Sequence, residues 1–426
     1  MNKYIEELNI DDRLLASYEE AEIFKSIHES SIVEIWHDTP RSLRSLKKGA
    51  AVRINNKPTR SGKMYSSPEM KTDISWFNSA NSNETPYYFL PFTKTPEKSS
   101  LPVITLDQPE TTLSKIEGCK PSLIENGIVI EKMSIEEDLG IYHLANTKAV
   151  RGFGYRYLYS INCLLKRKDG NEYEYSKVFD WTEKNTAISS FFKLIPLFEQ
   201  DIHKNFEETK IPRLLLSCNA VMELFHLFLF FFNDQALAQI IPKKIDDIIH
   251  GRAFISHALN IVENSEYNKM VGGCIDGEGF ARTPSYIFKN GCCKNIISKF
   301  STCENANCTG SAYRFDYSVL PQTKAAKIFI EPGTLSEKEV LSSYDLIGRI
   351  ETFQGMYESF DKNTFDFTAL LHIKVYKYGE CAGYCTKKVA LNLISILSRI
   401  SLLSNNLNYS GDGSFYIPSM VCEIEL

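Results

Sequence analysis

The sequence has no long apolar segment, which excludes a membrane-spanning helix. Its longest uncharged apolar run, Leu224–Phe232, is far shorter than the ~18 residues that a span requires, and it contains His226. The first residues, MNKYIEELNIDDRLL, lack the apolar region of a secretory signal. We therefore expect a cytoplasmic protein whose 11 cysteines are reduced thiols.

Several enzyme and binding signatures are absent as well. The chain has no G-x-S-x-G nucleophile elbow, phosphate loop or dinucleotide fingerprint. Its formal charge is −5 and its basic residues are scattered, so no nucleic-acid surface is indicated. Zinc sites normally use pairs of cysteines separated by two residues. The closely spaced cysteines of this chain have other separations, as in Cys292-Cys293, Cys303–Cys308 and Cys381–Cys385. We interpret them as ordinary buried or surface thiols.

The length and the composition favour two folded domains. A chain of 426 residues exceeds the size of one core, and a hydrophobic content of 43% is that of a globular protein. Predicted strands and helices mix without regular βαβ alternation, which favours an α+β fold with largely antiparallel sheets in both domains. The polar segment Lys204–Lys210 precedes Pro212 and a more apolar region. We place the domain boundary there, giving domains 1–205 and 206–426.

Apolar periodicity predicts three main helices. They are Ile10–Ile27, Ala220–Ala238 and Leu391–Leu403, each with apolar residues at helical spacing. Ser336 followed by Glu339 forms a capping box, so a further short helix starts at Glu337. Tyr155–Arg167 alternates at period two and is predicted to be a strand.

The stretch Gly272–Arg314 contains the clearest local signals. Pro284–Lys289 and Cys293–Lys299 are predicted strands joined by Asn290-Gly291, a dipeptide that suits a type I′ turn. Asp276-Gly-Glu-Gly279 forms a turn before this hairpin, and Thr309-Gly-Ser-Ala-Tyr-Arg314 follows it. The sequence thus predicts a compact unit with a central hairpin.

This series of motifs resembles the TldD/TldE (PmbA) family of metalloprotease-related proteins. Members carry a D-x-E-G turn, an N-G hairpin and a T-G-x-A-x-R segment at about this spacing. The matching positions are Asp276, Glu278, Gly279, Asn290, Gly291, Thr309, Gly310 and Arg314. Further matches follow at Ile330–Gly333 and Tyr378–Glu380, so the resemblance covers nearly the whole chain, more loosely in its first half.

The resemblance also implies where zinc ligands would stand. Catalytic members carry an H-E-x-x-x-H pattern on the first helix of the second domain and a late cysteine. By this register Leu224 and Phe225 replace the His-Glu pair, and Leu229 replaces the second His. The cysteine falls at Tyr409 or Ser410. We expect no zinc on this chain and zinc on a partner subunit.

Two weaker sites remain open. Glu223 and His226, at i and i+3, share a helical face and are weak candidates for a metal, although no third donor is visible. Asp276 and Glu278 could form an acid/base pair or bind Ca²⁺. We favour a structural role, with their carboxylates accepting backbone N–H bonds or pairing with Arg282 or Arg314.

The expected function follows from the resemblance. The chain looks like the non-catalytic TldE/PmbA-type subunit, which pairs with a zinc-bearing TldD-type subunit and helps to bind an extended peptide, either unfolded or a leader peptide. One alternative is a free-standing metallopeptidase using Glu223, His226 and a cysteine. The other is a peptide-binding homodimer without enzymatic activity.

Overall fold

The computed structural model describes most of the chain. The described residues are 5–10, 13, 15–37, 39–56, 61–70, 81–86, 104–125, 127–167, 172–199, 206, 210–238, 241–302, 308–314, 316–325, 327–410 and 413–426. Helices and mainly antiparallel sheets are mixed in it, so the predicted α+β class is confirmed. The predicted boundary segment Lys204–Lys210 lies almost wholly outside the described residues.

The chain folds into two compact units, and each contains more than one segment. Unit 1 comprises Met1–Lys193, Lys269–Thr283 and Ser298–Ala326, and unit 2 comprises Leu194–Asn268, Pro284–Ile297 and Lys327–Leu426. These units differ from the contiguous domains 1–205 and 206–426, because two segments of the C-terminal half belong to unit 1. One of them contributes strand β10 (Val271–Gly273), which pairs with β6 (Arg151–Arg167).

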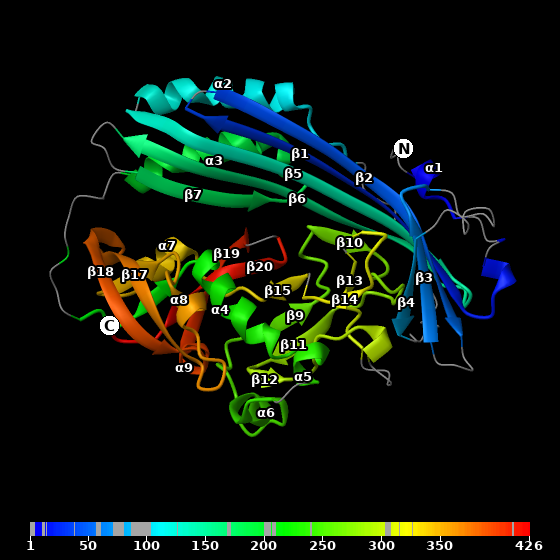
Figure 1. Cartoon of the computed structure of the whole chain (residues 1–426). Coiled ribbons are helices and arrows are strands. Elements are labelled where there is room, and N and C mark those ends of the chain that lie inside the picture. Colours follow the sequence, from blue (N-terminus) through cyan, green and yellow to red (C-terminus); the bar gives the residue numbers. More distant parts are fainter. Residues whose placement is uncertain are drawn as a thin grey trace. The chain divides into compact units, whose positions relative to one another are not determined.

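Unit 1 is built on an eight-stranded sheet of order β10-β6-β5-β1-β2-β3-β4, with β7 also paired to β6 (Figure 1). Its other strands are β1 Ala21–Trp36, β2 Thr39–Asn56, β3 Ser61–Ser67, β4 Asn81–Pro86, β5 Ile128–Asn146 and β7 Glu172–Phe179. The remaining elements are α1 Ile5–Leu8, η1 Leu15–Ser17, α2 Pro109–Glu125, α3 Lys184–Glu199, η3 Phe300–Thr302, β13 Ala312–Tyr313 and β14 Gln322–Thr323. Helix α2 packs on β1 and β5, and α3 crosses the division between the units.

Strand β1 corrects the prediction of a helix over Ile10–Ile27. Residues from Ala21 onward pair antiparallel with both β2 and β5, so the strand has neighbours on both edges. Its first seven residues are buried whichever face they occupy. A strand that is buried on both faces does not alternate between apolar and polar residues. Its apolar residues can therefore also match the spacing expected for one face of a helix. The periodicity therefore could not separate the two structures.

Strand β6 confirms the predicted alternation. Tyr157, Tyr159 and Ile161 point to one face and are completely buried, while residues between them are more exposed. On the same face of the neighbouring strand, Glu137 accepts hydrogen bonds from the Tyr157 hydroxyl at 2.8 Å and from Lys184 Nζ at 2.6 Å. The buried face of the sheet thus contains a hydrogen-bonded cluster around Glu137 beside its apolar core, while the hydroxyl of Tyr159 has no hydrogen-bond partner among the described residues.

Unit 2 is built on a ten-stranded sheet of order β12-β11-β9-β15-β20-β8-β16-β17-β18, with β19 also paired to β20. The strands are β8 Leu214–Leu216, β9 Ile261–Glu263, β11 Ser285–Lys289, β12 Cys292–Cys293, β15 Ile328–Ile330, β16 Ile347–Ile350, β17 Asp366–Lys377, β18 Glu380–Asn392, β19 Ile400–Ser410 and β20 Phe415–Cys422. The helices are α4 Cys218–Phe230, α5 Asp234–Leu237, α6 Lys243–Ile249, α7 Glu337–Ser342, α8 Met356–Ser359 and α9 Leu393–Ser398. The predicted capping box of Ser336 and Glu339 is present at the start of α7.

The predicted helix Leu391–Leu403 is wrong over half of its length. Asn392 caps a short helix, α9, and Arg399 ends it. From Ile400 the chain is strand β19, which pairs antiparallel with β20. Leu397 in the helix and Leu403 in the strand are both buried. The regular spacing of apolar residues therefore continues from the helix into the strand, which is why it suggested one long helix.

The predicted Asn290-Gly291 turn is confirmed. Asn290 has φ +49° and Gly291 has φ +72°, and the flanking residues Lys289 and Cys292 pair antiparallel. The second strand is shorter than the predicted Cys293–Lys299, because β12 contains only two residues. A Cβ at position 291 would lie 2.4 Å from the carbonyl oxygen of Ile255. Glycine is therefore required both for backbone conformation and for close approach.

We expect Gly291→Ala to lower the free energy of unfolding by more than the roughly 1 kcal/mol that positive φ alone costs a non-glycine residue. Gly251 is a matched control in unit 2, because its φ is +68° and a Cβ there would meet nothing within 4 Å. Urea denaturation of both variants measures the difference. Equal losses for Gly251→Ala and Gly291→Ala would contradict a clash with the Ile255 carbonyl.

Candidate functional site

Helix α4 is the element on which the resemblance places the metal ligands. Ser217 caps it by accepting a hydrogen bond from the N–H of Ala220, and the N–H of Phe231 closes its other end. The helix packs on β19 and β20. His226 and Phe230 are exposed on one side of the helix, and its six buried residues, Ala220, Val221, Leu224, Phe225, Phe228 and Leu229, lie on the opposite side.

The positions assigned to zinc ligands on α4 hold buried apolar side chains. Leu224 and Phe225 are fully buried, and Leu229 is 3% exposed. The ring of Phe225 packs edge-to-face on Phe228, which in turn contacts Phe288 of the hairpin. These side chains have no atom that coordinates a metal, and they form the core between the helix and the sheet.

The late position that corresponds to a cysteine is also occupied by packing groups. The ring of Tyr409 stacks on Tyr416 of the neighbouring strand, with ring centres 4.4 Å apart. Ser410 is buried and lies 2.8 Å from the side-chain oxygen of Asn219, to which its hydroxyl donates. Both side chains are held by contacts inside unit 2.

Glu223 and His226 share a face of α4, but the structure gives them different surroundings. Glu223 accepts a hydrogen bond of 2.8 Å from the N–H of Phe353, and burial raises the pKa of its carboxyl. His226 is exposed, with its ring edge-on to Tyr357. One of these two candidate donors is thus bound to the backbone, and the other faces solvent.

A metal ion does not fit these donors. In the part of the chain that the structure describes, no group of three His, Cys, Asp or Glu residues is arranged to hold one. The ten described cysteines are free thiols, and Cys303 of the predicted Cys303–Cys308 spacing lies outside the described residues. Glu223 already uses one oxygen on a backbone N–H. The described residues therefore offer two donors where a structural or catalytic zinc needs at least three from the protein.

The Asp276 turn lies in unit 1 and is fully buried. One oxygen of the Asp276 carboxylate accepts the N–H groups of Glu278 and Phe280, both at 2.9 Å, and the other accepts the N–H of Ala312 at 3.0 Å. Gly279 has φ +85°. The aspartate thus fixes its own turn and joins it to the segment that contains Thr309 and Arg314.

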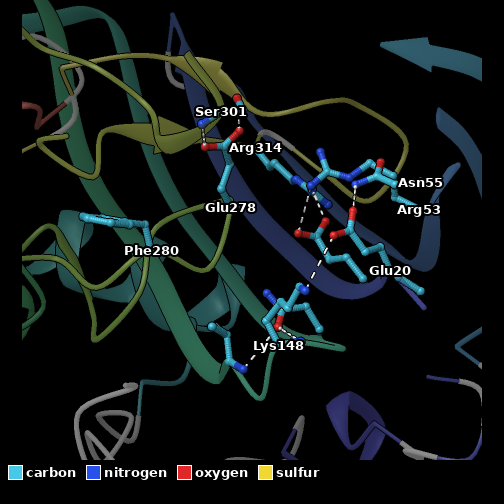
Figure 2. Close-up of polar contacts among 12 residues, drawn as sticks. Glu20, Arg53, Asn55, Lys148, Glu278, Phe280, Ser301 and Arg314 are labelled. Atoms are coloured by element: carbon cyan, nitrogen blue, oxygen red, sulfur yellow. Dashed lines mark hydrogen bonds and ion pairs between the residues drawn. The ribbon is translucent and has the colours of Figure 1, made fainter. Parts of the chain in front are cut away.

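Glu278 and Thr309 extend this interior network. Glu278 accepts two hydrogen bonds from Ser301, from its N–H at 3.0 Å and from its hydroxyl at 2.5 Å (Figure 2). Thr309 is bound to Ser298, whose N–H donates to the threonine hydroxyl at 2.8 Å. Gly310 has φ +68°. These motif residues hold two loops of unit 1 together.

Arg314 pairs with a residue that the sequence analysis did not select. Its guanidinium binds Glu22, and the other oxygen of Glu22 lies 3.2 Å from Arg53 Nη2. Arg282, the other predicted partner, donates to the Ile275 carbonyl oxygen at 2.9 Å, and its positive charge favours the ionised form of Asp276. Glu22 is 1% exposed and Arg53 3%. Charged residues inside the apolar runs at Ala21–Ile27 and Ala50–Ile54 were the signal that could have identified this cluster.

The family of the chain can be decided from its second half. Residues 213–424 match the sequence profile of the PmbA/TldA metallopeptidase C-terminal domain. The chain belongs to the TldD/PmbA family. No curated protein matches this TldD/PmbA-family chain.

Solved structures have the same fold as this TldD/PmbA-family chain. One is TldE from Thermococcus kodakarensis, with a TM-score of 0.79 and 14% identity, covering 97% of this chain and 98% of that one. A candidate modulator of a DNA gyrase from Thermotoga maritima gives 0.76 and 14%, covering 97% of both chains. A similar candidate from Bacteroides thetaiotaomicron gives 0.68 and 13%, covering 95% and 94%. At these identities the likeness establishes the fold.

Membership of this family gives a broad functional description of the chain. It is a TldD/TldE-like, metallopeptidase-related protein. Among the described residues, no helix is both long enough and apolar enough to cross a membrane.

We expect Leu229→Asp to destabilise unit 2 of this TldD/PmbA-family protein by several kcal/mol, because it places an unpaired charge in the core. The neighbouring Phe230 is 57% exposed on the same helix. Phe230→Asp is therefore the control, with a change of about 0.5 kcal/mol or less. Thermal and urea denaturation compare the two, and a Leu229→Asp protein as stable as Phe230→Asp would place this side of α4 at a surface.

The Asp276 carboxyl gives the stability of unit 1 a pH dependence. Burial, together with the nearby Glu278 carboxylate, outweighs the three N–H bonds and raises the pKa of Asp276 to about 7, against about 3.9 for a free aspartate. The folded state then binds this proton more tightly than the unfolded state. The free energy of unfolding should therefore rise as the pH falls from 7 toward 4.

Asp276→Asn should remove this contribution, so the advantage of the wild type over the variant should grow as the pH is lowered. At pH 7 the variant should still lose about 1–3 kcal/mol, because its amide nitrogen cannot accept the N–H of Ala312. Urea denaturation of both proteins between pH 4.5 and 7.5 measures this. Parallel curves across that range would show that Asp276 does not titrate there.

Proposed function

We propose that this chain is the non-catalytic TldE/PmbA-like subunit of a heterodimeric TldD/TldE-type zinc metalloprotease that acts on unfolded or leader peptides. The observation that carries the proposal is the core of α4, where Leu224, Phe225 and Leu229 are buried at positions that the family register assigns to metal ligands. The similarity to TldE from Thermococcus kodakarensis supports the same conclusion. Zinc would then reside on the partner, a TldD-type subunit.

The role of this subunit is architectural rather than chemical. Metal-assisted hydrolysis requires a bound ion with an open coordination position for water. The described residues provide apolar packing on α4 in place of the donors. The contribution of this chain is to complete the peptide-binding surface of the partner.

Sheet edges supply a means of holding an extended peptide. Strand β18 stands at the end of the second sheet, with β17 as its strand partner among the described residues. The N–H of Phe206 donates to the carbonyl oxygen of its Tyr384 at 2.8 Å. An exposed edge can bind a peptide backbone through main-chain hydrogen bonds, which depend little on side-chain identity. Such binding suits a protease complex that acts on unfolded or leader peptides.

The purified chain should contain no stoichiometric zinc and should cleave no peptide, whereas a TldD-type partner should gain peptidase activity when this chain is added. The measurements are metal content by mass spectrometry and cleavage of an unfolded peptide by the chain, by the partner and by their mixture. The partner with an equal amount of an unrelated protein is the control. A chelator added to the mixture should abolish cleavage.

Two outcomes would overturn the proposal. Chelator-sensitive cleavage by this chain alone, lost in Glu223→Ala or His226→Ala, would establish a free-standing metallopeptidase. A stable homodimer in light scattering that binds peptide, contains no zinc and does not affect the partner would establish a peptide-binding protein without enzymatic activity.

A further inference from the structure

A shallow cavity of about 300 Å³ opens within unit 2, between the segments that contain Asn260, Glu331 and Leu402. Pro332, Leu335, Leu402 and Leu403 form much of its wall. Small-molecule sites generally begin at about this volume. The cavity therefore suits a single side chain or a small amine, not a larger ligand.

Glu331 is the charged group of this cavity, and its carboxylate is held by neutral donors. One oxygen accepts the hydroxyl of Tyr286 at 2.7 Å, and the other accepts the side-chain amide of Asn260 at 2.8 Å. The N–H of Glu331 also donates to the Asn260 carbonyl oxygen at 3.1 Å. These donors fix the orientation of both carboxylate oxygens of Glu331, and because they are neutral they leave its negative charge in place.

No described Lys, Arg or His residue forms an ion pair with Glu331. The nearby Lys289 places its ammonium group over the ring of Tyr286, 4.9 Å from the ring centre. On the other wall, the hydroxyl of Ser401 donates to Glu423, and Glu423 is paired with Arg213 at 2.9 Å. Glu331 is therefore the carboxylate of the cavity whose charge is not balanced by a cation.

We propose that this cavity binds a primary ammonium group carried on an aliphatic chain, with Glu331 as its counter-ion. A carboxylate accepts charge-assisted hydrogen bonds from an ammonium group, and these are stronger than bonds between neutral groups. The leucine and proline side chains would cover the methylene groups, as protein surfaces do for lysine stems. The ligand is a lysine side chain of a peptide or a free aliphatic diamine.

This binding site stands independently of the proposed role in a protease complex, because none of its lining residues belongs to α4 or β18, on which that role rests. A purely structural explanation is available for Glu331, since its bonds to Tyr286 and Asn260 join β11 to the segment after β15. The two explanations differ in one measurable respect. Only a ligand site requires binding of an amine to depend on the negative charge.

Titration of the full-length chain with Nα-acetyl-lysine amide, followed by NMR or calorimetry, tests the proposal. We expect saturable binding with a Kd on the order of millimolar, and binding at least about tenfold weaker in Glu331→Gln. Nα-acetyl-norleucine amide has a similar aliphatic chain without the nitrogen and should bind at least about tenfold more weakly than the lysine derivative. Glu358 is an exposed carboxylate of unit 2, and Glu358→Gln should leave the affinity unchanged.

A second pair of variants tests the proposal even if Glu331→Gln fails to fold. Thr334 lines the cavity and is exposed. Thr334→Lys places a competing ammonium group at the opening and should abolish binding, whereas Thr334→Met adds similar bulk without charge and should retain it. Loss in both variants would show that shape, not charge, controls binding and would overturn the proposal.

Cadaverine distinguishes the two sources of the ligand. Tighter binding of the lysine derivative supports a peptide ligand, and tighter binding of cadaverine supports a free diamine. Absence of saturable binding by both amines, or equal affinity in the wild type and Glu331→Gln, would overturn the proposal and leave Glu331 as a structural link. Lower thermal stability of Glu331→Gln with unchanged affinity would do the same.

Discussion

The ion pair between Arg314 and Glu22 joins residues 292 positions apart in the chain, and the organisation of unit 1 depends on it. Both side chains are buried. Removal of one partner from a buried ion pair typically costs about 3–5 kcal/mol. Arg314 also places its guanidinium 4.4 Å from the centre of the Phe24 ring. Arg314 consequently connects a segment from the second half of the chain to strand β1 of the first sheet.

The same interactions explain the roles of the family motifs. Asp276 and Glu278 could have formed an acid/base pair, but their oxygens are used by backbone N–H groups and by Ser301. Asp276 is fully buried and Glu278 is 1% exposed. Recognisable motifs in this chain therefore mark the positions where distant segments meet. The resemblance places the metal ligands on α4, where this chain has apolar side chains.

Much of the fold could be predicted from local sequence. The Asn290-Gly291 turn and the capping box of Ser336 and Glu339 were correct, because each depends on a conformational preference within four residues. The α+β class followed from the mixture of periodicities. The core of α4 was predictable too, since an apolar helix without a polar stripe must be buried.

Other features could not be read from local sequence. Helical spacing was misleading at Ile10–Ile27 and Leu391–Leu403, where strands buried on both faces or a helix followed directly by a strand give the same spacing. The discontinuous units and the partner of Arg314 are set by long-range pairing, which a single sequence does not show. The carboxylate of Glu331 was part of a noted motif, but only the structure shows that neutral donors surround it.

The discontinuity of unit 1 has a consequence for synthesis of the chain on the ribosome. Lys193 ends the first segment of the unit, and Ala326 ends the last. At typical elongation rates of about 5–20 residues per second, the 133 residues between them take roughly 7–27 s to be made. β6 lacks β10 until 80 of these residues have been made (273 − 193), and Glu22 lacks Arg314 until 121 have been made (314 − 193). The nascent first sheet must therefore persist without its last strand and without this ion pair while the second half of the chain is being made.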